Sequence, residues 1–281
     1  MARNFGGLIG KSALQGSEKR SRIQWFYEYL STLPEEAIAP DVSAKIFRYF
    51  RDQQLDRNPY AAEKLKYNQL LLDRYDVLRS QIVAHNDPFD RALRYVLAGN
   101  IIDFGAHQSV ELEETLTRVV EARFDRDHSS ALRKDLSEAK RILWLGDNAG
   151  EIVMDKLFID ALGLKNVVYA VRGAPVINDA TLEDAAFVDL AKVAHVIANG
   201  NDAPSTLLHA CSEEFCSVFY DADIIISKGQ GNFEGLMNHK EKRIYFLLMA
   251  KCQVIAEKLA VSKGSFVVFC NQSENAKDSY S

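Results

Sequence analysis

The sequence contains little cysteine, and none of it is arranged for metal binding or disulfide pairing. The 281 residues include four cysteines, all in the last third of the chain, and no pair has the CxxC spacing of a zinc or redox motif. We therefore expect free, buried thiols, and neither a disulfide scaffold nor a zinc site. The four residues are Cys211, Cys216, Cys252 and Cys270.

An excess of basic residues and a long apolar run are also missing. Lys and Arg number 34 against 39 Asp and Glu, a formal net charge of −5, which disfavours nucleic acid or an anionic membrane as a partner. No window approaches ~18 uninterrupted apolar residues, and residues 1–20 lack the apolar segment and cleavage site of a secretory signal. We expect a cytoplasmic protein that does not act at a membrane.

Two kinds of pattern divide the chain. Residues 17–137 read as helical, because apolar residues recur every three or four positions and prolines mark the breaks. After Arg141, short apolar runs alternate with helix-length segments, which is typical of a parallel sheet buried on both faces. The predicted strands are Ile142–Leu145, Asn166–Val171, Val193–Ala198, Ile224–Ser227, Ile244–Met249 and Ser265–Cys270.

These patterns predict an α/β fold with a doubly wound, mainly parallel sheet. A helical region at residues 1–137 precedes the sheet, packs against it and contributes to an active-site crevice. A Rossmann-like domain at residues 138–281 follows and carries the functional site.

The first predicted strand runs directly into GDNAGEIV, residues 146–153, which then begins a helix. Asp147 and Asn148 are thereby placed at the carboxyl end of the strand, where open α/β sheets bind ligands. The free N–H groups of the helix would favour an anion at the same point. Taken alone, the segment fits an ordinary strand-to-helix turn with an Asp or Asn cap equally well.

The second predicted strand is followed by RGAPVINDAT, residues 172–181, which places Asp179 beside Asp147. Two carboxylates and the amide of Asn148 in one crevice would repel each other without a cation. Oxygen ligands of this kind suit Mg²⁺, Mn²⁺ or a similar hard ion. We therefore predict a metal site at this edge of the sheet, with both aspartates facing solvent.

A third strand ends in SKGQGNFEG, residues 227–235. Its lysine, Lys228, can neutralise a phosphate while the small residues let backbone N–H groups approach it. The order of lysine and glycines is wrong for a P-loop and for a dinucleotide fingerprint. A plain glycine turn is the alternative interpretation.

Two weaker signals lie elsewhere. The segment AGNIIDFG, residues 98–105, interrupts the helical region, and Asn100 or Asp103 could reach the crevice. Lys251 follows the fifth predicted strand at the same edge and could supply a second cation for phosphate. Helix caps and a solvated surface lysine are the alternatives.

Together, GDNAGEIV, RGAPVINDAT, SKGQGNFEG and AGNIIDFG resemble the motifs of the DUF89 family, also called the damage-control phosphatase family, and of its prokaryotic-type branch in particular. The resemblance implies a phosphatase that depends on a divalent metal ion, Mn²⁺, Mg²⁺, Co²⁺ or Ni²⁺. Its substrates would be small phosphorylated metabolites, such as sugar phosphates or damaged or surplus metabolite phosphates. Many members of that branch have paired cysteines near the N-terminus, and this chain has no cysteine before Cys211.

The resemblance also assigns residues. The family's metal ligands match Asp147, Asn148 and Asp179. We predict that Asp147 or Asp179 acts in catalysis, either by attacking phosphorus directly or by orienting a water. The residues that match substrate- or phosphate-binding positions are Lys228, Asn232, Lys251, Asn100 and Asp103.

Two other functions use the same kind of crevice. A non-catalytic sensor would bind a nucleotide or phosphorylated metabolite without turnover. A methyltransferase that uses S-adenosylmethionine also binds its cofactor at glycine-containing turns after strands. The clustered acidic residues argue against the methyltransferase.

Overall fold

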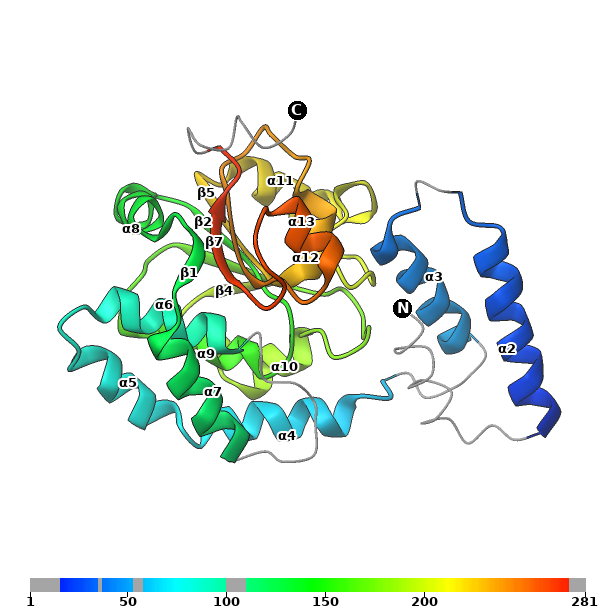
Figure 1. The fold of residues 1–281 in the computed structure, drawn as a ribbon, viewed down its shortest axis with the longest axis horizontal. Helices are drawn as coiled ribbons and strands as arrows, with labels where there is room; N and C mark the ends of the chain where they lie inside the picture. Colours follow the sequence, from blue (N-terminus) through cyan, green and yellow to red (C-terminus); the bar gives the residue numbers. More distant parts are fainter. Residues whose placement is uncertain (1–15, 35–36, 53–57, 100–109, 273–281) are drawn as a thin grey trace.

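The structure is a computed structural model that describes residues 16–34, 37–52, 58–99 and 110–272. A seven-stranded sheet forms the centre of this part of the chain (Figure 1). The strand order is β1-β7-β6-β5-β2-β3-β4, and every neighbouring pair is parallel except β6 and β7. The strands are β1 Phe124–Asp127, β2 Ile142–Leu145, β3 Val167–Val171, β4 His195–Ala198, β5 Ile224–Lys228, β6 Ile244–Met249 and β7 Phe266–Cys270.

The predicted α/β class and mainly parallel sheet are confirmed. Each of the six strands expected from the sequence is present, with ends within two residues of the predicted ones. Continuous apolar runs identified them, because a central parallel strand is buried on both faces. In β2 all four residues are buried.

One strand was missed. Strand β1 lies within the residues expected to be wholly helical, and it pairs in parallel with β7 at the edge of the sheet. Its sequence is FDRD, of which Phe124 is buried while Asp125 and Asp127 are exposed. Four residues with three charges contain too little apolar pattern to indicate a strand. Because β1 precedes the predicted boundary at residue 138 and its partner β7 follows that boundary, the sheet includes residues from both predicted regions.

Alternate side chains of the strands point into two cores on opposite faces of the sheet. In β2, Ile142 and Trp144 belong to one core, whereas Leu143 and Leu145 belong to the other. The helices on the first face are α4 Ala61–Leu72, α5 Tyr75–Val83, α6 Pro88–Gly99, α7 Val110–Glu121, α8 Ser129–Glu138, α9 Glu151–Ala161 and α10 Leu182–Phe187. Those on the second face are α11 Glu213–Asp221, α12 Gly229–Leu236 and α13 Gln253–Lys258.

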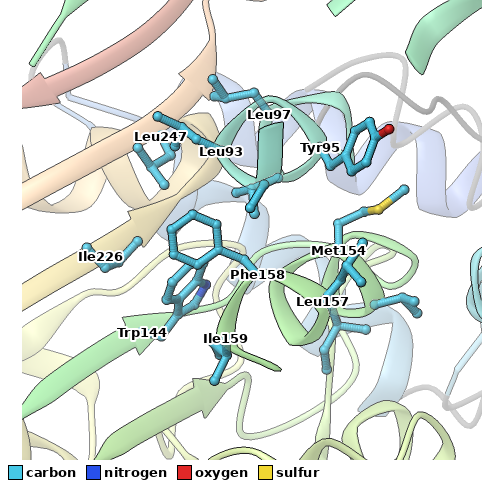
Figure 2. Packing of buried hydrophobic residues seen from close by; sticks show 14 of the residues in the cluster. Leu93, Tyr95, Leu97, Trp144, Met154, Leu157, Phe158, Ile159, Ile226 and Leu247 are labelled. Atoms are coloured by element: carbon cyan, nitrogen blue, oxygen red, sulfur yellow. The ribbon is translucent and has the colours of Figure 1, made fainter. Parts of the chain in front are cut away.

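The N-terminal helices and the sheet share the first core. Figure 2 shows Leu93 and Leu97 of α6 near Phe158 of α9, with Trp144 of β2 beneath them. The rings of Trp144 and Phe158 are 5.4 Å apart between centroids. The helical region therefore packs over the sheet as predicted, and α4, α5 and α6 each contact α9.

Two further helices, α2 Gly16–Ser31 and α3 Ala39–Asp52, lie to one side of the sheet, and α3 is the nearer of the two (Figure 1). Their shared hydrophobic cluster includes Val176 of the loop that follows β3. Ala44 of α3 packs with Ala203 and Leu207. Arg48 of the same helix donates its Nε to Asp202 at 2.9 Å. Among the described helices, none is both long and apolar enough to cross a membrane.

Candidate active site

The loop after β2 is held tightly against its neighbours. The backbone N–H of Gly146 donates to the carbonyl of Ala170, and a β-carbon on Gly146 would lie 2.6 Å from the hydroxyl of Tyr169. Only glycine fits this approach. The next residue, Asp147, therefore has a fixed position at the carboxyl end of the strand, and its side chain is mostly buried.

The structure brings Asp147, Asn148 and Asp179 together. The backbones of Asn148 and Asp179 form an isolated antiparallel β-bridge between the loops that follow β2 and β3. Next to it, the N–H of Ala180 donates to the carbonyl of Asp147 at 2.8 Å. The expectation that the two aspartates face solvent is wrong, because Asp147 and Asp179 are only 9% and 3% exposed. The loops fold back over the sheet edge and pack against one another, which the sequence pattern does not reveal.

Arg172, which directly follows β3, links these loops. Its Nε donates to Asp179 Oδ2 at 2.6 Å, and its Nη1 donates to Asn232 Oδ1 at 3.0 Å. Its Nη2 lies 3.6 Å from Asp147 Oδ1 and has no hydrogen-bond partner among the described residues. A buried guanidinium thus faces both aspartates.

Lys228 is the last residue of β5 and is fully buried. Its Nζ lies 2.8 Å from Asp155 Oδ1 and 3.1 Å from Glu151 Oε2, both on α9. The sequence pattern predicts that this lysine lies in the glycine-rich turn. In the structure it ends the strand, and its side chain extends to α9. Tyr169 donates its hydroxyl to the other oxygen of Asp155 at 2.7 Å.

The glycine turn itself reaches Asp147. Gly229 has φ +77°, and a β-carbon there would overlap the carboxylate of Asp147. Asn232, in the next helical turn, is buried and donates to the carbonyls of Gly146 and Lys228 at 3.0 and 2.8 Å. The third motif is therefore built against the first one.

The remaining predicted site residues are Lys251, Asn100 and Asp103. Lys251 is exposed, and its charge favours the ionised form of Asp147. Asn100 and Asp103 lie outside the described residues.

Helix α4 contributes residues that sequence reasoning missed. Lys64 pairs with Asp184 at 2.5 Å, and Asn68 accepts a hydrogen bond from the N–H of Gly150 at 2.6 Å. The available signal was the spacing of Lys64, Asn68 and Leu71, which places all three on one helix face. That face is buried, so two polar residues there required partners.

All buried acidic and basic side chains of the described residues belong to this site. Five are acidic and three are basic, which leaves an excess of two negative charges in the fully ionised state. They are Lys64, Asp147, Glu151, Asp155, Arg172, Asp179, Asp184 and Lys228.

Burial and crowding of like charges perturb these groups. Burial raises the pKa of Asp147, and the neighbouring carboxylates of Glu151 and Asp179 raise it further. Burial likewise raises the pKa of Asp179, although Arg172 opposes the shift. For Lys228, burial favours the neutral amine, yet Asp155 and Glu151 more than offset this and raise its pKa. An added cation, or a proton bound to one of the carboxylates, would therefore stabilise this cluster.

The donor set fits a hard divalent cation. Within the described ranges, no three His, Cys, Asp or Glu side chains converge as a metal site. The predicted ligands, Asp147, Asn148 and Asp179, include only two such side chains, because the third ligand is the amide of Asn148. Asn148 donates its Nδ2 to Asp147 Oδ2 at 2.9 Å and to Glu151 Oε1 at 2.7 Å, so its Oδ1 is the atom that would contact an ion. Carboxylate and amide oxygens together with two excess negative charges match the charge and preference of an ion such as Mg²⁺ or Mn²⁺.

Comparison with known proteins identifies the family. Residues 13–267 match the model of the damage-control phosphatase ARMT1-like domain. The chain belongs to the damage-control phosphatase family. The motifs described above all fall within the matched residues.

Three known proteins are similar to this chain over most of their length. An uncharacterized protein of Methanocaldococcus jannaschii is 36% identical over 83% of this chain and 80% of its own. Damage-control phosphatases of Pyrococcus horikoshii and Archaeoglobus fulgidus are 35% and 32% identical, over 76% and 75% of this chain and 75% of their own. A crystal structure of a DUF89 family protein from P. horikoshii matches with a TM-score of 0.86 at 31% identity, covering 94% of each chain.

Proposed function

We propose that this protein is a divalent-metal-dependent phosphatase that releases phosphate from small phosphorylated metabolites. One observation carries the proposal: the buried charges of the described chain gather around the loops at the carboxyl edge of the sheet, with two negative charges in excess. The relatives named damage-control phosphatases support the activity. We further propose sugar phosphates or damaged or surplus metabolite phosphates as the substrate class.

In this proposal, Asp147, Asn148 and Asp179 hold the metal ion, which would be Mn²⁺, Mg²⁺, Co²⁺ or Ni²⁺. When bound, such an ion supplies positive charge that stabilises the charge distributed over a transferring phosphoryl group. Arg172 keeps Asp179 oriented through the 2.6 Å hydrogen bond to its Oδ2. Gly229 keeps the space beside the Asp147 carboxylate free of a side chain.

The aspartates are also the proposed catalytic groups. Asp147 and Asp179 lie on adjoining loops at the carboxyl edge of the sheet, and a carboxylate beside a reacting group can accept a proton from it. Either could take a proton from an attacking water or attack phosphorus itself. The buried Nη2 of Arg172 is a donor that a phosphate oxygen beside Asp147 could use.

Two lysines, Lys228 and Lys251, are the proposed contacts for the substrate phosphate. Among the described residues, the Nζ of Lys228 donates to Glu151 and Asp155, and we assign the third N–H of this ammonium to a phosphate oxygen. Lys251, which is exposed, is the proposed outer contact for the same phosphate. Asn232, Asn100 and Asp103 remain proposed substrate-binding residues.

The test is a screen of phosphorylated metabolites, with phosphate release measured in Mg²⁺, Mn²⁺, Co²⁺ or Ni²⁺ and in EDTA. We expect release with at least one ion and none in EDTA. A variant with Asp147→Asn, which keeps the shape of the side chain, is the matched control and should abolish release. Tight binding of a phosphorylated metabolite without turnover, or methyl transfer from S-adenosylmethionine without phosphate release, would contradict the proposal.

A further inference from the structure

The amide of Asn68 bridges the two loops that carry the proposed metal ligands. We propose that Asn68 is a positioning residue, which fixes the loop of Asp147 relative to the loop of Asp179. The role of those loops rests on the proposed function. The bridge itself comes from α4, a helix far from both loops in the sequence.

One end of the amide holds the first loop. The N–H of Gly150 donates to Asn68 Oδ1 at 2.6 Å. Gly150 lies three residues after Asp147, has φ +81° and precedes the first residue of α9. This contact therefore sets the point at which the loop turns into the helix.

The other end holds the second loop through Asp184. Asn68 donates its Nδ2 to Asp184 Oδ1 at 3.0 Å. Asp184 Oδ2 in turn accepts hydrogen bonds from the backbone N–H and the hydroxyl of Thr181, each at 2.8 Å. Thr181 lies two residues after Asp179, so two successive hydrogen-bonding steps connect Asn68 to the second loop.

Burial makes this connection rigid. Asn68 and Asp184 are 1% and 6% exposed, and Lys64, which pairs with Asp184, is 2% exposed. A helix face that packs on a core needs only apolar residues, and a buried amide is destabilising unless its donor and acceptor are satisfied. Here one end of the amide is satisfied by the first loop and the other by Asp184 of α10, which holds Thr181 of the second loop, so the positions of the two loops are coupled.

The experiment compares Asn68→Ala with wild-type protein by hydrogen exchange and Mn²⁺ titration. We expect faster amide exchange in residues 146–151 and also in residues 178–182, and a Kd for Mn²⁺ that is higher by about 10- to 100-fold, the scale for residues that orient metal ligands. Leu78→Ala on α5, a core residue outside both loops, is the control for general destabilisation.

A reciprocal exchange tests the pairing directly. Asn68→Asp places two carboxylates face to face. Asp184→Asn leaves one oxygen where two accept hydrogen bonds and removes the charge that pairs with Lys64, so each substitution should loosen both segments. The double variant restores one donor and one acceptor, and we expect it to recover part of the Mn²⁺ affinity and of the exchange protection.

The proposal is overturned if Asn68→Ala and Leu78→Ala affect the 178–182 segment and Mn²⁺ binding equally, or if the double variant shows no recovery. Absence of phosphatase activity in wild-type protein would count against the proposed function alone, because hydrogen exchange needs no turnover.

Discussion

Arg172 Nε lies 2.6 Å from Asp179 Oδ2, and both side chains are almost completely buried. The same guanidinium contacts Asn232 and faces Asp147, so one side chain touches all three motifs that follow β2, β3 and β5. A planar group with several fixed donors can make these contacts together, whereas an ammonium cannot.

We expect Arg172→Gln to lower the free energy of unfolding by about 3–5 kcal/mol, because it leaves the buried Asp179 without its ion-pair partner. Arg172→Lys keeps the charge but loses the planar guanidinium with its several fixed donors. It should therefore be more stable than Arg172→Gln and still reduce kcat/KM by about 10-fold or more. Urea unfolding and phosphate release measure the two effects. Equal activity of Arg172→Lys and wild type would show that the fork geometry is not required.

Asp147→Asn is expected to stabilise the metal-free protein by about 0.5–2 kcal/mol, since it removes one of several buried carboxylates that repel each other. The same substitution should abolish metal-stimulated phosphate release. Thermal unfolding in EDTA measures the first effect. A lower melting temperature in EDTA would mean that Asp147 stabilises the fold and is not held in a strained position for function.

Apolar runs and glycine-rich turns made the central strands and the loops after them predictable. Those signals are local, since a buried strand and its turn are adjacent in sequence. The contribution of α4 was not predictable in the same way, because a buried Lys64 or Asn68 looks like any polar residue on a helix surface. The burial of Asp147 and Asp179 likewise depends on how separate loops pack.

The missed strand β1 leads to a pH prediction. His128, at its end, accepts a hydrogen bond on Nδ1 from the N–H of Cys270 at 2.9 Å, which requires that nitrogen to be unprotonated. Burial lowers the pKa of His128, and Arg126 lowers it further. A histidine whose pKa is lower in the folded state than in the unfolded state destabilises the fold as pH falls below ~6.5.

We therefore expect the stability of wild-type protein to fall relative to that of His128→Asn between pH 7 and pH 5, because the amide oxygen of asparagine can accept the same hydrogen bond and does not titrate. The difference should be about 1 kcal/mol, the scale of one hydrogen bond. Urea unfolding at both pH values measures it. Identical pH dependence in the two proteins would exclude His128 as a contributor.

Lys228→Met should be strongly destabilising, by about 3–5 kcal/mol, because it leaves Glu151 and Asp155 buried without the ammonium between them. The variant Lys228→Met with Asp155→Asn removes one charge of each sign and should recover much of that stability in urea unfolding. Its kinetics then separate two roles of the lysine. If Lys228 binds the substrate phosphate, kcat/KM stays about 10²-fold or more below wild type although the protein is folded and binds Mn²⁺. Recovery of kcat/KM together with stability would instead make Lys228 a counter-charge for α9, and Lys251 would then be the remaining lysine for the phosphate.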